Sequence, residues 1–268
     1  MLTILDLFSG IGGFSLGLER TNGFKTSAFA EIDPFCRKVL NKNWPEIPIF
    51  EDIKTITQDD LQCLGKIDVV CGGFPCQPVS VAGKQCGVND DRWLWPEFFR
   101  IICMVKPEWV LVENVVGLLS INEGRLFGGI LANLAQIGYN AEWQVLRASD
   151  LGASHKRERL FLVAYSSGIR LGSTPIFKRK FYKELYEGDL WSNYTTCYIS
   201  DLERTFPEIP NHLRNNDGIS ERLDRSIMGK DYHVGPTHVI QHRMKSIGNA
   251  ILPQLTEYIG KCILDSLF

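Results

Sequence analysis

The sequence lacks the features that would place a protein in a membrane, outside the cell or around a structural metal. Its longest apolar runs, such as Trp109–Val112, fall far short of the roughly 20 residues that a transmembrane helix needs. The first residues show no basic leader followed by an apolar stretch, and none of the eight cysteines stands in a C-x-x-C pair. We therefore expect a cytoplasmic protein with reduced thiols, no membrane contact and no metal site.

An excess of charge of one sign is also lacking, because 29 basic and 31 acidic residues leave a net charge of −2. The balance is uneven along the chain. Residues 1–164 hold 16 basic and 19 acidic residues, a net −3, whereas residues 165–247 hold 12 and 10, a net +2. Within the second part, Arg170–Lys183 carries five basic residues and no acidic one. Such a basic stretch is typical of polyanion binding and equally of a solvated face, so the total charge excludes no nucleic-acid partner.

Short β-rich runs alternate with helical patterns over residues 1–164, which predicts an α/β fold with a mostly parallel sheet and helices on both faces. The last two runs are joined by a loop alone, and we expect them to pair antiparallel at the edge. Regular patterns decay after Tyr165 and return only near the end. We thus predict a main domain at 1–164, a small irregular segment at 165–245 and a returning helical part at 246–268. The predicted strands are Leu2–Phe8, Thr26–Ala30, Ile67–Cys71, Trp109–Val112, Glu142–Leu146 and Leu160–Ala164, and the predicted helices are Phe14–Arg20, Pro34–Asn41, Trp93–Met104, Leu126–Ile137 and Asn249–Leu267.

The first strand runs into a glycine-rich turn, Ser9–Phe14, that opens a helix. Glycines there let the backbone approach a ligand, and the helix N-terminus offers N–H groups. Glu31 stands at the tip of the second strand, 21 residues after Gly10, where a ribose hydroxyl is normally held. Asp52, at a third acidic tip, is placed to accept a hydrogen bond from an adenine amino group. The turn alone is typical of any α/β protein, but the turn and two acidic tips together favour an adenosine-containing cofactor.

A stiff loop, Gly72–Gln85, follows the fourth strand. Two prolines restrict the backbone around Cys76 and fix a thiol at the carboxyl end of a strand, where ligands bind in open α/β sheets. Glu113 ends the next strand and is either a second group at this edge or an ordinary surface acid. The alternative for Cys76, a buried structural cysteine, better suits the three cysteines in apolar surroundings, namely Cys71, Cys103 and Cys262.

In order and spacing these motifs resemble those of the cytosine-5 DNA methyltransferase family of bacterial and phage type. The resemblance covers residues 1–164 and 246–268. It implies a Rossmann-like methyltransferase sheet, S-adenosylmethionine as cofactor, and a cytosine flipped out of double-stranded DNA as substrate. The motifs that carry it are DLFSGIGGF, GGFPCQPVSVAGKQ, Glu113-Asn114-Val115, His155-Lys156-Arg157-Glu158-Arg159 and Ile247-Gly248-Asn249-Ala250.

The resemblance also implies a role for each group. Cys76 is the nucleophile that adds to carbon 6 of cytosine, which makes carbon 5 able to accept a methyl group from a sulfonium donor. Glu113 holds or protonates ring nitrogen 3. Arg159, with Arg157 beside it, holds the cytosine carbonyl and supports the carboxylate. For the cofactor, the resemblance points to Phe8, Gly10 and Gly12 at the amino-acid part, Glu31 and Ile32 at the ribose, Asp52 and Ile53 at the adenine, and Gly72, Leu94 and Asn249 closing the pocket.

Residues 77–92 are rich in Gly, Ser, Lys and Gln, and we expect a lid that closes on DNA; an ordinary mobile loop is the alternative. Basic side chains suit phosphates, and the aromatic residues after the basic stretch are expected to form mainly the core of the irregular segment. The expected DNA contacts are Gln77, Ser80, Lys84, Gln85 and Arg92 in the lid and Lys178, Arg179 and Lys180 in the basic stretch.

Two other functions stay open on the sequence. The segment available to read DNA is short, which motivates cytosine in a structured RNA such as tRNA as the substrate. The second alternative is a cofactor-binding, DNA-interacting module with little turnover. We expect a monomer and allow for a cognate restriction endonuclease as partner. No motif encodes which bases are read.

Overall fold

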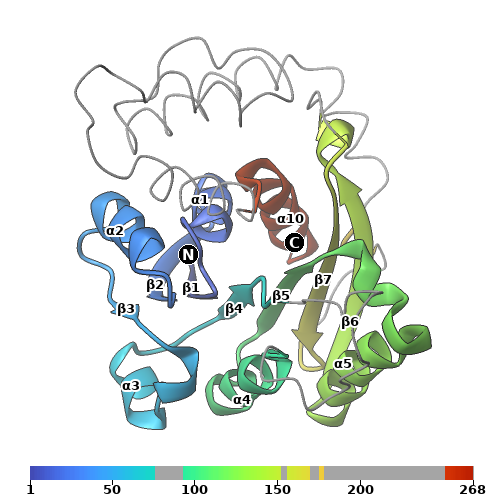
Figure 1. Cartoon of the computed structure of the whole chain (residues 1–268), viewed down its shortest axis with the longest axis horizontal. Helices are drawn as coiled ribbons and strands as arrows, with labels where there is room; N and C mark the ends of the chain where they lie inside the picture. The colour runs from blue at the N-terminus through green and yellow to red at the C-terminus, as the bar shows by residue number, and fades with distance from the viewer. Residues whose placement is uncertain (76–92, 152–155, 170–174, 178–250, 268) are drawn as a thin grey trace, which may run out of the picture.

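The computed structural model describes residues 1–75, 93–151, 156–169, 175–177 and 251–267. Within these ranges, seven strands form one sheet (Figure 1). The strands are β1 (Leu2–Leu7), β2 (Phe24–Ala30), β3 (Ile49–Phe50), β4 (Val69–Gly72), β5 (Trp109–Asn114), β6 (Tyr139–Arg147) and β7 (Glu158–Ser166). The helices are α1 (Gly13–Glu19), α2 (Pro34–Asn43), α3 (Gln58–Cys63), α4 (Trp95–Val105), α5 (Arg125–Gln136) and α10 (Pro253–Ser266), with 3₁₀-helices η1 (Ile53–Thr55), η2 (Val116–Leu119), η3 (Ile121–Gly124) and η4 (Ala148–Leu151).

The strand order is β3-β2-β1-β4-β5-β7-β6. Neighbours from β3 to β5 pair in parallel, and β7 runs antiparallel between β5 and β6. The predicted parallel sheet with an antiparallel pair at its edge is therefore confirmed. Every residue of β4 and β5 is buried, as expected for central strands that are covered on both faces.

Side chains alternate between two apolar layers, one on each face of the sheet. Leu5, Val70 and Val110 belong to the layer that packs against α4 and α5. Ile4 and Val69 belong to the opposite layer, which packs against α1 and α10. Figure 1 shows the same division, with α1 and α10 on one side of the sheet and α3, α4 and α5 on the other. The carboxyl ends of the parallel strands are thereby held at one edge by a rigid framework.

The carboxyl-terminal helix returns to the start of the chain, as predicted, but its predicted first residue is wrong. α10 begins at Pro253 rather than at Asn249, with Leu252 as its N-cap residue. Proline has no N–H and suits the first turn of a helix, where that group would have no helical partner. The hydroxyl of Thr256 donates to the Gly13 carbonyl at 3.1 Å, which fastens α10 to the first turn of α1.

Other predicted boundaries move by a few residues. α4 begins at Trp95 rather than Trp93, and β2 begins two residues before its predicted start. Two elements, β3 and α3, were not predicted, because two and six residues are too short for a periodic signal. The domain boundary near residue 165 stays a prediction, since most of residues 165–245 lies outside the described ranges. In the described part of the chain, no helix has the length and apolar character needed to cross a bilayer.

Candidate active site

The glycine-rich turn after β1 depends on backbone conformations that favour glycine. Gly10 and Gly12 have φ values of 55° and 89°, in the left-handed region. A Cβ on Gly12 would also lie 2.7 Å from the Trp44 ring. Phe8 adopts a positive φ of 53° as well, and its ring stacks on Phe98 at a centroid distance of 6.3 Å. Trp44 on one side and the Phe8–Phe98 stack on the other therefore fix the turn at the edge of the sheet.

Glu31, at the tip of β2, is joined directly to that turn. Its Oε2 accepts from the Gly10 N–H at 2.7 Å, and its Oε1 accepts from the Asp33 N–H at 2.8 Å. Burial raises the pKa of this carboxyl, although the two N–H donors oppose the shift. The next residue, Ile32, is 69% exposed, which is unusual for a large apolar side chain. The structure thus places a carboxylate and an open apolar surface side by side, where the sequence predicted ribose contacts.

The predicted adenine residues lie at the third tip. The Asp52 side chain accepts from the Lys54 N–H at 2.9 Å and caps η1, while Ile53 is buried in the core. Gly72 ends β4, and a Cβ there would lie 2.1 Å from the Leu7 carbonyl oxygen of β1. Leu94 is the N-cap residue of α4 and is partly buried against the core.

An ion pair between a buried carboxylate and a half-buried arginine joins β5 and β7 at the same edge. Arg159 Nε lies 2.8 Å from Glu113 Oε1. The pairing of β5 with β7 sets Glu113 opposite Phe161, so Arg159, two residues from Phe161, projects to the same face as a diagonal neighbour. Glu113 is 8% exposed. Burial raises the pKa of Glu113, and the positive charges of Arg159 and Arg157 only partly offset this shift.

The residues just before Pro75 are held beside this ion pair by Asn114, the neighbour of Glu113 in β5. The Asn114 side chain donates to the Phe74 carbonyl at 3.2 Å and accepts from the Val115 N–H at 2.9 Å. A Cβ on Gly73 would lie 2.9 Å from Glu113 Oε2, so glycine leaves room for the carboxylate. The segment that leads into the predicted nucleophile therefore starts beside Glu113.

Several predicted residues cannot be placed relative to this edge. Those outside the described residues are Cys76, Gln77, Ser80, Lys84, Gln85, Arg92, Lys178, Arg179, Lys180 and Asn249. Of the cysteines expected to be structural, Cys71 and Cys262 are buried and Cys103 is half-buried.

Sequence reasoning missed residues that hold the site from behind. Arg100 in α4 donates to the carbonyls of Ile53 and Ile56 at 2.7 and 2.9 Å, and so holds the turn that carries the third tip. Asp6 is fully buried and accepts from both the N–H and the hydroxyl of Ser15 at 3.3 and 2.8 Å. A polar residue at the end of an apolar strand marks Asp6 in the sequence, whereas Arg100 leaves no signal.

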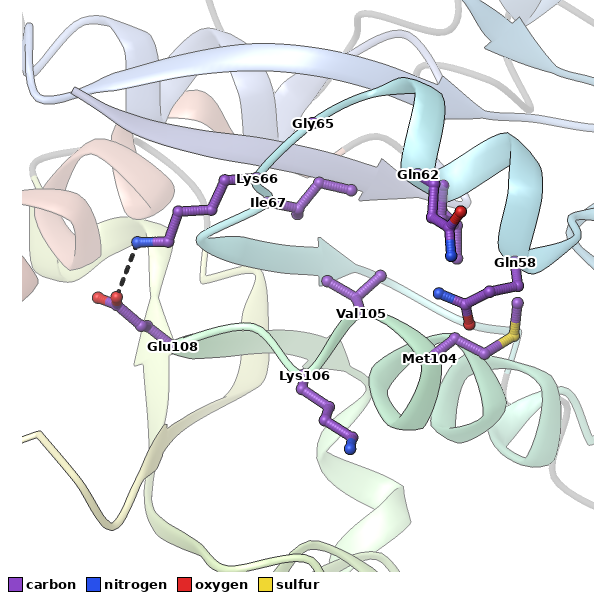
Figure 2. Close-up of a pocket in the computed structure, with 10 residues that line it drawn as sticks. Gln58, Gln62, Gly65, Lys66, Ile67, Met104, Val105, Lys106 and Glu108 are labelled. Carbon is purple, nitrogen blue, oxygen red and sulfur yellow. Dashed lines mark hydrogen bonds and ion pairs between the residues drawn. The ribbon is translucent and has the colours of Figure 1, made fainter.

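A cavity of about 350 Å³ lies at the opposite edge of the sheet, ahead of β4 and β5 (Figure 2). Figure 2 shows Lys66 reaching Glu108 on its rim, and their ion pair spans 2.9 Å. It is lined by α3, by the end of α4 and by the residues that lead into β4 and β5, so it does not belong to the edge that carries Glu31 and Glu113.

Comparison with known proteins identifies the family. A model described as C-5 cytosine-specific DNA methylase matches residues 2–228. The chain belongs to the C-5 cytosine-specific DNA methylase family. Type II methyltransferase M.AquIA of Picosynechococcus sp. is 36% identical over 244 residues, which cover 82% of this chain and 96% of that protein.

Other members of the methylase family match over a shorter part. Type II methyltransferase M.NgoBI of Neisseria gonorrhoeae is 39% identical over 196 residues, or 70% of this chain. This chain spans 59% of that relative, and between 36% and 51% of the length of six other curated type II enzymes. A solved structure of a protein encoded within an Escherichia coli prophage superimposes with a TM-score of 0.68 at 20% identity, covering 100% of this chain and 99% of that one, which supports the fold.

Proposed function

We propose that this protein transfers a methyl group from S-adenosylmethionine to carbon 5 of a flipped cytosine in a specific DNA sequence, through a covalent adduct with Cys76. The observation that carries the proposal is the ion pair between the buried Glu113 and Arg159. It lies at the carboxyl edge of the sheet, next to the segment that leads to Cys76 and within the same framework as the glycine turn. Membership of the methylase family supports the same reaction.

The residues at the first and second strand tips suit S-adenosylmethionine. This cofactor supplies a methyl group bound to a positively charged sulfur. A Cβ on Gly10 would have no atom within 4 Å, so there is open space beside the turn for the amino-acid part, and Glu31 offers carboxylate oxygens to ribose hydroxyls. The 69% exposed Ile32 gives the adenosine an apolar surface that folding alone leaves in water.

Cys76 acts on the substrate base. Its thiolate forms a bond to carbon 6, and the electron pair displaced from the 5,6 double bond makes carbon 5 nucleophilic. After carbon 5 has taken the methyl group, a base removes the proton from carbon 5. The electron pair of the broken carbon 5–hydrogen bond re-forms the 5,6 double bond. The Cys76 thiolate leaves with the electrons of its bond to carbon 6, which returns the thiolate to its starting state.

Glu113 and Arg159 act on the opposite side of the ring. Because burial raises the pKa of Glu113, this carboxyl keeps its proton to a higher pH than an exposed one and can donate it to nitrogen 3. Donation withdraws electrons from the ring as the thiolate adds. Arg159 orients Glu113 through the 2.8 Å contact and carries positive charge toward the cytosine carbonyl.

The partner that follows from this chemistry is double-stranded DNA, with the target base extruded from the stack because carbon 6 is otherwise out of reach. Gln77, Ser80, Lys84, Gln85 and Arg92, with Lys178, Arg179 and Lys180, are the proposed DNA contacts. We further propose a cytoplasmic monomer with a cognate restriction endonuclease as its biological partner.

The test is transfer of a labelled methyl group from S-adenosylmethionine to mixed-sequence duplex DNA. We expect incorporation by the wild-type chain and none by Cys76→Ala. Absence of transfer to any DNA by a folded wild-type chain would refute the proposal. If the chain methylates tRNA in preference to DNA when both are present, RNA is the substrate instead.

A further inference from the structure

We propose that Arg37 is a positioning residue for the adenosine part of the cofactor. Its guanidinium fastens the tip of β2 to the tip of β3 and so fixes the ribose and adenine contacts relative to each other. The inference rests on the proposed function, because it takes S-adenosylmethionine as the ligand of this edge. Arg37 belongs to none of the motifs by which the family was identified.

Arg37 lies in the first turn of α2 and points back to the end of β2. Its Nη1 donates to the Ile32 carbonyl at 2.7 Å and to the Glu31 carbonyl at 3.3 Å. Its Nη2 lies 3.3 Å from Glu51 Oε1. The Arg37 side chain is only 23% exposed, so the guanidinium lies between the two tips rather than out in solvent.

The two carbonyls belong to the residues that face the adenosine. The Glu31 carboxylate is held on its other side by the Gly10 and Asp33 N–H groups. Arg37 completes this arrangement by fixing the backbone of Glu31 and Ile32. An exposed isoleucine gains by rotating to cover its apolar surface, and a backbone tied at its carbonyl restricts that movement. Ile32 is thereby kept open to a ligand.

The tip of β3 is joined to β2 over a short stretch only, and Arg100 holds the η1 turn that follows it. β3 contains only two residues, paired with the last two residues of β2. The Glu51 contact with Arg37 comes directly after this short strand and directly before Asp52. One side chain therefore links the residue at the predicted ribose site to the residue ahead of the predicted adenine site.

A simple surface ion pair is the competing explanation, since Glu51 is 77% exposed and such pairs contribute little. The contacts to the Ile32 and Glu31 carbonyls distinguish the two explanations. Nη1 makes both of them while Nη2 meets Glu51, so both arms of the planar guanidinium are in use. Lysine keeps the positive charge but cannot reach both tips with one rigid group. If Arg37 acts by position, Arg37→Lys should therefore bind the cofactor more weakly than wild type. If only the positive charge matters, Arg37→Lys should bind it with wild-type affinity.

The experiment measures dissociation constants of the full chain by calorimetry for S-adenosylhomocysteine and for 5′-methylthioadenosine, which lacks the amino-acid part. We expect Arg37→Met to weaken both ligands by about tenfold, and Arg37→Lys by a smaller but measurable factor. The dissociation constant of S-adenosylmethionine is measured as well. If Arg37 acts by position, its substitution should weaken the binding of S-adenosylmethionine and of S-adenosylhomocysteine by the same factor, although only the first carries a charge on sulfur. The control is Lys38→Met, which removes the same charge from the next, exposed residue of α2 and should change neither ligand.

Three results would overturn the inference. These are wild-type affinity in both Arg37 variants, a loss confined to the sulfonium ligand, and equal losses in Arg37→Met and Lys38→Met. A fourth result would assign Arg37 to folding alone. In that case the affinity loss disappears once binding is measured well below the melting temperature of each variant. If the wild-type chain binds none of these ligands, the proposed function itself fails, which is a distinct outcome.

Discussion

Replacing Glu113 with glutamine should separate activity from stability, because Glu113 is buried and is the proposed proton donor to the cytosine ring. Glutamine keeps the shape and a hydrogen-bond acceptor for Arg159 Nε, which now lies 2.8 Å from Oε1. It cannot donate a proton as a carboxylic acid does. Loss of one general acid typically costs 10²–10⁴ in rate, or about 3–5 kcal/mol in the barrier. We expect single-turnover methylation to fall by that range with little change in cofactor affinity.

The same substitution should not weaken the fold at neutral or basic pH. Burial raises the pKa of Glu113, so the folded chain holds this proton more tightly than the unfolded chain does. The wild type therefore loses stability as the pH rises above the ordinary carboxyl pKa of about 4.3, whereas a glutamine does not titrate. The melting temperature of Glu113→Gln relative to wild type should rise from pH 4 to pH 8.

Glu158→Gln is the matched control, since Glu158 also pairs with an arginine but on the surface. Its Oε1 lies 2.6 Å from Arg147 Nε, and the two side chains are 42% and 55% exposed. We expect activity within about twofold of wild type, because exposed pairs contribute little. The reasoning would be refuted if Glu113→Gln retained activity within tenfold of wild type, or if its loss of activity matched a loss of folded protein.

Three further substitutions test the framework. Gly72→Ala places a Cβ 2.1 Å from the Leu7 carbonyl oxygen and should lower the free energy of unfolding in denaturant by about 3 kcal/mol, whereas its control Gly117→Ala, with no atom within 4 Å, should change it little. Burial raises the pKa of Asp6 to about 7, so the wild type should lose stability relative to Asp6→Asn between pH 4 and 7; parallel melting curves across that range would count against this. Gly128→Ala, in open space within α5, should stabilise the chain by about 0.5–1 kcal/mol in the same unfolding assay.

The sequence was sufficient to predict that Glu31 and Glu113 follow or end strands at one edge of the sheet. Strand tips carry Glu31 and Glu113, and parallel strands bring their carboxyl ends to one edge whatever the details of packing. Side chains alternate between the two faces of β7, so Arg159 lies on the same face as Phe161. Once Phe161 is known to pair with Glu113, the contact between Arg159 and Glu113 follows. Short elements were missed for a physical reason: β3 has too few residues to show a period.

The contacts that hold the tips in place could not be predicted. Arg37 and Arg100 reach backbone carbonyls on other elements, and a carbonyl exists at every residue. Such contacts depend on how helices lie against the sheet, and they leave neither spacing nor periodicity in the sequence. The hydrophobic pattern alone would place Ile32 in the core, because an apolar residue after a strand is usually buried; only the family resemblance indicated that it faces a ligand.

The most direct test of the central claim is covalent trapping on DNA that contains 5-fluorocytosine. With fluorine at carbon 5, there is no proton on that carbon to remove, so Cys76 stays bound to carbon 6. The covalent protein–DNA adduct should survive denaturation and appear as a shifted band on a denaturing gel. We predict a complex that requires S-adenosylmethionine and is absent in Cys76→Ser. A wild-type chain that binds both S-adenosylhomocysteine and DNA, yet gives no complex on any fluorinated sequence, would contradict the account.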